Sequence, residues 1–173
     1  CFTPATQLTE MIRGKEISAS ELIETVLGRI EASEPKINAF ATLTAEAAIA
    51  AAGEADAALA SGETVGPLHG IPVTIKDLSM TAGVPTERGS HITKGEVPET
   101  DAPFVARLKA AGAISLGKTT TSEFGWKGVS QSPLTGITSN PWKAGYNAGA
   151  SSAGAGAAAA AGYGPLHQGS DGA

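Results

Sequence analysis

Lys76 is a charged residue at a position where the sequence predicts a buried strand. It directly follows residues 71–75, an apolar run bounded by Gly70 and Asp77. Lysine is seldom fully buried without a partner, because burial disfavours the charged ammonium group and lowers its pKa by up to about 3–5 units. A buried, neutral Lys76 could act as a general base. The alternative is a strand-end lysine whose ammonium group reaches water.

Two groups of small residues could supply partners for such a base. Ser151 and Ser152 begin an Ala- and Gly-rich segment, so their hydroxyls would lie at the positive end of a helix dipole. Ser170 and Asp171 belong to the second group, the small-residue loop 169–173. Each group also has an ordinary interpretation, because serine is a common helix cap and such loops are common turns.

The segments around these residues alternate between helix and short apolar strand. Ser18 and Glu21 form an S-x-x-E capping box that opens a helix, and Pro35 is expected beyond the end of this helix. Asp101 is expected to cap a later helix, and residues 113–116 follow that helix as a strand. A helix followed by a short apolar strand is typical of an α/β fold.

The length and charge of the chain narrow the classes of protein to which it can belong. Its 173 residues suit part of one domain, with a mainly helical region over residues 1–62 and the start of an α/β core over residues 63–173. The 12 basic and 17 acidic residues, a net charge of −5, argue against a nucleic-acid partner. No apolar run approaches the roughly 18 residues of a membrane span. The single cysteine, Cys1, fits a reducing compartment, so we expect a cytoplasmic protein without a membrane partner.

Three parts of the chain resemble, in order, the characteristic blocks of the amidase signature family. Residues 66–77 resemble the segment with the catalytic lysine, and residues 117–125 resemble the next block. Residues 149–154, together with 169–173, resemble the Gly- and Ser-rich signature. The resemblance implies an α/β fold, namely the α/β/α layered amidase-signature fold with a mixed central sheet, of which this chain would be the N-terminal part.

The resemblance also implies roles for individual residues. Lys76 matches the base, and Ser151 matches a bridging serine that follows a cis peptide bond, here after Ala150. Gly172 and Ala173 match the loop whose backbone N–H groups form the oxyanion hole, and the nucleophilic serine would be the second residue beyond Ala173. Three further residues match supporting positions: Ser152, Ser170 and Asp171.

Amide hydrolysis is the activity that this resemblance implies. Members of the family cleave a carboxylic amide to an acid and an amine through an acyl-enzyme, so we expect a small-molecule amide as partner, no cofactor, no metal and a possible homodimer. One alternative within the family is the glutamine amidotransferase subunit that supplies ammonia for tRNA-dependent transamidation. Another is a non-catalytic amide-binding relative or an inactive fragment, because the nucleophile is not among the 173 residues.

Nucleotide and metal binding are competing interpretations with less support. Residues 154–159 fit the dinucleotide fingerprint G-x-G-x-x-A, but the polar loop 140–147 precedes them where a hydrophobic strand is required. Candidate metal ligands are scattered along the chain, which does not favour a metal site. They are His69, His91, His167 and Cys1. We expect His69 and His167 to be structural.

Overall fold

The computed structural model describes residues 2–149 and 151–172. Its helices are α1 (Ala5–Arg13), α2 (Ala19–Ile37), α3 (Ala45–Ala60), α4 (Pro103–Ala110) and α5 (Ala153–Ala161), with short 3₁₀ turns at His91–Thr93 and Glu123–Gly125. Its strands are β1 (Phe40–Leu43), β2 (Pro72–Lys76), β3 (Ile114–Thr119), β4 (Gln131–Ser132), β5 (Gly136–Ile137) and β6 (Leu166–His167). Across these described ranges, no helix combines the length and the apolar character needed to cross a membrane.

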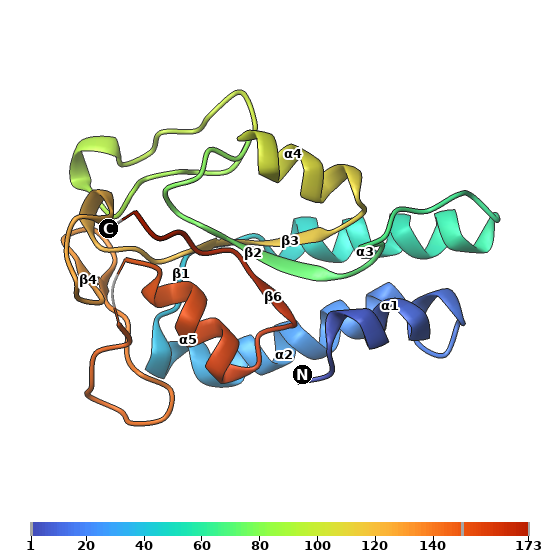
Figure 1. The fold of residues 1–173 in the computed structure, drawn as a ribbon, viewed down its shortest axis with the longest axis horizontal. Coiled ribbons are helices and arrows are strands. Elements are labelled where there is room, and N and C mark those ends of the chain that lie inside the picture. Colours follow the sequence, from blue (N-terminus) through green and yellow to red (C-terminus); the bar gives the residue numbers. More distant parts are fainter. Residues whose placement is uncertain (1, 150, 173) are drawn as a thin grey trace.

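The main sheet of the described residues has the strand order β1-β3-β2-β6 (Figure 1). Strand β2 runs parallel to β3 and to β6, whereas β1 runs antiparallel to β3. The sheet is therefore mixed, which confirms the expectation. A separate pair of short strands, β4 and β5, forms an antiparallel hairpin.

Helices cover both faces of this sheet (Figure 1). On one face, Val73 and Ile75 of β2 pack with Val105 of α4. On the other face, Ile114 and Leu116 of β3 belong to a larger core with side chains of α1, α2, α3 and α5. Because the side chains of a strand alternate between faces, residues two positions apart, such as Val73 and Ile75, face the same core. The layered α/β/α arrangement is confirmed.

Helix α2 begins as predicted and ends later than predicted. Ser18 Oγ accepts a hydrogen bond from Glu21 N (3.0 Å), and Glu21 Oε2 accepts one from Ser18 N (2.8 Å), so the capping box is confirmed. The expectation that Pro35 lies beyond the helix is wrong, because α2 continues to Ile37. A proline inside a helix lacks the N–H donor, and its ring crowds the carbonyl four residues earlier. The last turn of α2 still closes, because Asn38 N donates to Glu34 O (2.9 Å).

Asp101 does not cap helix α4, which corrects a second expectation. The helix starts at Pro103 after Ala102, and it has no side-chain cap. A proline in the first turn needs no N–H partner and has a φ angle suited to a helix, so the helix can begin without a cap. Asp101 instead accepts hydrogen bonds from Ala82 N (2.8 Å) and from Lys109 Nζ (2.8 Å).

Helix α5 approaches the sheet so closely that a glycine is required. A Cβ atom on Gly154 would collide with the carbonyl oxygen of Ala39 and with the backbone of Thr120. Gly154 N donates to Thr120 O (3.2 Å), and Thr120 N donates to Ala39 O (2.8 Å). The first turn of α5 is thus tied to residues at the ends of β1 and β3.

Candidate active site

Lys76 ends β2 inside the protein, with 0% of the residue exposed. Its Nζ atom forms hydrogen bonds with Ser151 Oγ (2.8 Å), Ser152 Oγ (3.0 Å) and Ser170 Oγ (2.9 Å). The carbonyl oxygen of Ser170 lies 3.5 Å from the same atom. The side chain is buried among hydroxyl groups, and the alternative of an ammonium group in water is wrong.

Ser151 and Ser152 reach Lys76 from the start of α5. Ser152 occupies the cap position of this helix, but its side chain makes no cap hydrogen bond. Its Oγ atom instead donates to Ser170 O (3.0 Å) and accepts a hydrogen bond from Ser170 N (3.1 Å). The peptide bond between Ala150 and Ser151, expected to be cis, involves a residue outside the described ranges.

The loop after β6 brings the third hydroxyl to the site. Strand β6 pairs with β2 through Val73 and Leu166, so the chain that follows β6 runs beside the end of β2. Ser170 lies three residues after the end of β6, and the loop continues with Asp171 and Gly172. Ala173, the second expected oxyanion-hole residue, lies outside the described residues.

Burial governs the protonation of Lys76. It lowers the pKa of Lys76 below the ordinary lysine value, and the negative charge of Asp171 partly opposes this effect. None of the ion pairs found in ranges 2–149 and 151–172 includes Lys76. A neutral amine has a lone pair and can accept a proton from a serine O–H group. The arrangement can therefore pass a proton between the amine and Ser151.

Gln168 is a site residue that the sequence interpretation missed. Its Oε1 atom accepts a hydrogen bond from Lys76 N (3.0 Å), and Ser79 Oγ lies 3.4 Å from the same oxygen. Its backbone N donates to Thr74 O (2.9 Å). Gln168 thus extends the pairing of β6 with β2 up to Lys76. Its position before the loop 169–173 was the only signal that the sequence offered.

The three histidines do not converge on a ligand. His69 Nε2 lies 2.9 Å from Ala55 O, and His167 contacts Thr74 Oγ1 (3.0 Å) and Gly164 O (2.9 Å). Burial lowers the pKa of His167. Of the residues with described positions, no group of three or more His, Cys, Asp and Glu side chains could hold a metal ion.

A family model described as Amidase matches residues 21–173 of this sequence. The chain belongs to the Amidase family. Relatives within the family include enzymes of different kinds. An acylamidase of Rhodococcus erythropolis is 43% identical over 169 residues, which are 98% of this chain and 35% of that protein. A glutamyl-tRNA(Gln) amidotransferase subunit of Heliobacterium modesticaldum is 42% identical over 167 residues, which are 96% of this chain and 34% of that protein.

Solved structures agree with this family membership. The native peptide amidase of Stenotrophomonas maltophilia matches with a TM-score of 0.88 at 33% identity, covering 94% of this chain and 34% of that one. This Amidase-family chain therefore spans about a third of the length of the relatives that it matches.

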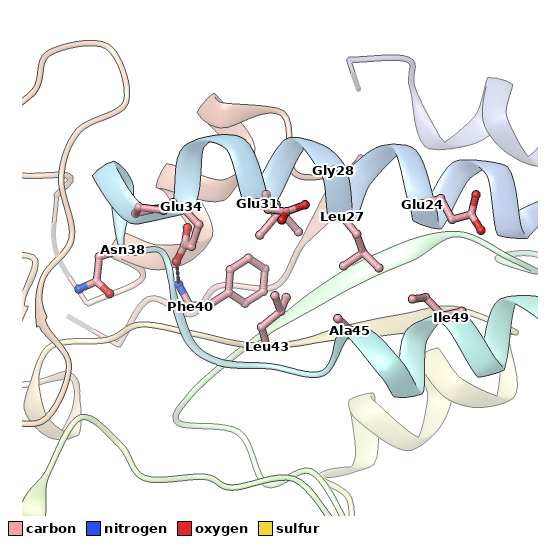
Figure 2. A pocket seen from close by; sticks show the side chains of 12 residues that line it. Glu24, Leu27, Gly28, Glu31, Glu34, Asn38, Phe40, Leu43, Ala45 and Ile49 are labelled. Carbon is pink, nitrogen blue, oxygen red and sulfur yellow. Dashed lines mark hydrogen bonds between the residues drawn. The ribbon is translucent and has the colours of Figure 1, made fainter.

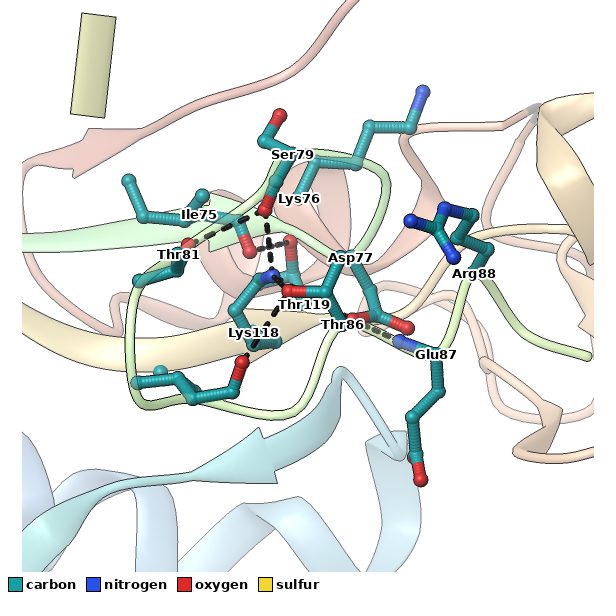
Figure 3. A network of polar contacts seen from close by, with 12 residues as sticks. Ile75, Lys76, Asp77, Ser79, Thr81, Thr86, Glu87, Arg88, Lys118 and Thr119 are labelled. Atoms are coloured by element: carbon teal, nitrogen blue, oxygen red, sulfur yellow. Dashed lines mark hydrogen bonds and ion pairs between the residues drawn. The ribbon is translucent and has the colours of Figure 1, made fainter. Parts of the chain in front are cut away.

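A second buried lysine lies near Lys76 in this Amidase-family chain. Lys118 is 0% exposed and is the second-last residue of β3. Figure 3 shows its side chain directed away from that of Lys76 and toward Asp77, Ser79 and Thr86. Burial lowers the pKa of Lys118 to about 8, although Asp77 opposes this effect. The sequence alone indicated no role for Lys118.

A wide cavity lies apart from the Lys76 site. It is a groove of about 980 Å³ between α2, β1 and the start of α3. Figure 2 shows Leu27, Phe40 and Leu43 directed into it, with Glu24 and Glu31 on α2. The residues that line this groove include neither Lys76 nor the serines around it.

Proposed function

We propose that the whole protein, meaning the chain together with a nucleophilic serine beyond residue 173, hydrolyses carboxylic amides. The observation that carries this proposal is the 2.8 Å hydrogen bond between Lys76 Nζ and Ser151 Oγ, made by a lysine that is 0% exposed. A buried amine whose pKa is lowered can serve as a general base near neutral pH. Membership of the Amidase family supports the same activity.

The proposed reaction begins with two coupled proton transfers. Neutral Lys76 Nζ accepts the proton of Ser151 Oγ, while Ser151 accepts the proton of the nucleophilic hydroxyl. The nucleophile forms a C–O bond to the amide carbonyl carbon, and the carbonyl oxygen becomes an oxyanion. Backbone N–H groups of Gly172 and Ala173 would stabilise this oxyanion, each donor being worth roughly 2.7–4 kcal/mol in comparable sites.

The leaving group and a water molecule complete the cycle. As the C–N bond breaks, the proton held by Lys76 returns through Ser151 to the departing nitrogen, which leaves as an amine or ammonia. Water then attacks the acyl-enzyme, with Lys76 again taking a proton through Ser151. The acid leaves and the serine regains its hydrogen.

A serine-reactive fluorophosphonate probe tests this proposal. We expect labelling of the whole protein, no labelling of residues 1–173 alone, and loss of labelling in Lys76→Met. The same proteins, assayed with a set of simple carboxylic amides, should release acid only when the probe also labels. Absence of labelling in the whole protein would contradict the proposal and favour a non-catalytic amide-binding relative.

A second function is favoured by the 42% identity to a glutamyl-tRNA(Gln) amidotransferase subunit. In that case the whole protein would release ammonia from glutamine for transamidation of misacylated tRNA, together with partner subunits. Glutamine-dependent transamidation in the presence of such subunits is the deciding assay. Robust activity would replace general amide hydrolysis as the proposed function.

A homodimer and a cytoplasmic location also belong to this proposal. The single cysteine supports a reducing compartment. Light scattering coupled to size-exclusion chromatography tests the dimer, and fractionation of the source cells tests the location.

A further inference from the structure

Lys118 and Asp77 form a buried ion pair that the proposed reaction does not use. Lys118 Nζ lies 3.7 Å from Asp77 Oδ1, and the two side chains are 0% and 1% exposed. Lys118 Nζ also donates to Ser79 O (2.7 Å) and to Thr86 Oγ1 (2.6 Å). One ammonium group thus connects the end of β3 with the turn after Lys76 and with a later loop.

An irregular register between β2 and β3 places this pair on the opposite face from the active site. Val73 pairs with Ser115, but Ile75 pairs with Lys118, so β3 has one extra residue between these pairs. In an unbroken register Lys118 would pair with Lys76, and two lysines would lie side by side on one face. The extra residue instead pairs Lys76 with Thr119 and turns Lys118 toward the face of Ile75.

Asp77 anchors the residue that follows Lys76 on several sides. Its backbone N donates to Thr119 O (3.0 Å), and its carbonyl oxygen accepts from Arg88 N (3.1 Å). Its Oδ1 atom accepts from Glu87 N (3.2 Å), which Figure 3 also shows. The turn after Lys76 is therefore held by β3 and by the loop 86–88 together.

Ser79 links this network back to the active site. The carbonyl oxygen of Ser79 accepts a hydrogen bond from Lys118 Nζ. The hydroxyl of Ser79 contacts Gln168 Oε1, the same oxygen that accepts a hydrogen bond from the backbone N of Lys76. Gln168 begins the chain that carries Ser170 to Lys76 Nζ. A movement of the turn would thus be transmitted to Lys76 and to one of its hydroxyl partners.

The energy of a buried ion pair gives a reason to look for a role beyond stability. Moving two charges out of water costs several kcal/mol per ion. A protein in which apolar residues replace such a pair is often as stable as the original protein. We propose that buried Lys118, held by Asp77 and Thr86, positions Lys76 by fixing the turn Asp77–Ser79 so that the amine stays directed at Ser151. Lys118 is a positioning residue here, and this inference rests on the proposed amide hydrolysis.

The variant Lys118→Met of the whole protein tests the inference, with Lys109→Met as matched control. Lys109 also pairs with an aspartate, at 2.8 Å, but on the protein surface. The readouts are the number of sites titrated by the fluorophosphonate probe, the labelling rate constant per titrated site, and kcat and KM with an amide. We expect Lys118→Met to lower the rate per site and kcat by roughly 10- to 100-fold with little change in KM, since small misplacements of catalytic groups cost this much.

These readouts separate positioning from stability. A merely structural role would reduce the number of titrated sites and leave the rate per site equal to that of Lys109→Met, which would overturn the inference. Wild-type protein that the probe does not label would overturn the proposed function itself, and the inference with it.

A second pair of variants decides the question if Lys118→Met does not fold. Thr86→Val removes the hydroxyl that accepts from Lys118 and keeps the shape of the side chain, whereas Thr86→Ser keeps the hydroxyl. We expect a lower rate per site in Thr86→Val and a rate near that of the wild type in Thr86→Ser. Equal rates in the two variants would overturn the inference.

Discussion

Lys76 Nζ and Ser151 Oγ lie 2.8 Å apart, although the two residues are separated by 75 positions in the sequence. Strand β2 brings Lys76 to its end, and helix α5 brings Ser151 to its start. The two elements meet because Gly154, in the first turn of α5, lies against the backbone of Ala39 and Thr120. A contact between backbone atoms thus sets the distance between two side chains.

Replacement of Lys76 by methionine in the whole protein should abolish most of the turnover. Methionine has a similar length but no amine, so the proton of Ser151 loses its acceptor. General-base catalysis contributes typically about 10²–10⁴-fold, and we expect kcat to fall by at least this range. Steady-state hydrolysis measures the effect, with Lys109→Met as control. Turnover close to that of the wild type would refute the assignment of Lys76 as base.

The pH dependence of kcat/KM should follow the deprotonation of Lys76. Burial lowers the pKa of this lysine below its ordinary value of 10.5, and Asp171 partly opposes the shift. Activity should therefore rise with pH, with a midpoint below 10.5. Asp171→Asn removes the opposing negative charge, so the midpoint should move to lower pH.

Asp101→Asn is the control for that experiment, because Asp101 pairs with Lys109 at the surface. Its pH profile should coincide with that of the wild type. A midpoint that moves to higher pH in Asp171→Asn would contradict the proposed electrostatics of the site.

Replacing Gly154 by alanine should destabilise the protein, whereas replacing Gly156 by alanine should stabilise it. A Cβ atom at Gly154 would collide with backbone atoms, whereas one at Gly156 meets no atom within 4 Å. Gly154→Ala should lower the free energy of unfolding by roughly 1–3 kcal/mol, as overpacking does, and should reduce kcat because Ser151 moves with α5. Gly156→Ala should raise the free energy of unfolding by about 0.5–1 kcal/mol through helix propensity. Urea unfolding of both variants checks this, and equal effects would show that α5 packs differently.

Asp56 should stabilise the protein by capping a helix other than its own. It extends from α3 to the start of α2, where Oδ1 accepts from Ala19 N (2.7 Å) and Oδ2 accepts from Ser20 N (3.1 Å). Asp56→Ala should lower the free energy of unfolding by about 0.5–2 kcal/mol. Glu54→Ala, an exposed change on the same helix, should have little effect.

The stabilisation by Asp56 should also depend on pH. Burial alone would raise the pKa of this carboxyl, but the hydrogen bonds from Ser20 and Ala19 outweigh it, so the pKa lies below its ordinary value of 3.8. A lowered carboxyl pKa means that the contribution is present above pH 3.8 and is lost as the pH falls through the folded-state value. Unfolding curves of wild type and Asp56→Ala should therefore converge in acid; a constant difference would refute the capping role.

Local patterns in the sequence were sufficient to predict much of the fold. The capping box at Ser18 and Glu21 and the strand ending at Lys76 depend on residues within a few positions of each other. Such signals are carried by hydrogen bonds and side-chain periodicity within one element. The same patterns indicated Lys76, Ser151 and Ser170 as candidates, although they could not indicate which of them meet.

Tertiary structure alone decided what surrounds each charged side chain. Asp101 does not cap α4, because its Oδ1 atom accepts a hydrogen bond from Ala82 N, which lies 19 positions away in the sequence. The extra residue in β3 decides that Lys118 faces Asp77 and not Lys76. These outcomes depend on contacts between residues far apart in sequence. A residue's neighbours along the chain set its local conformation, whereas the burial that moves a pKa depends on every element packed around it.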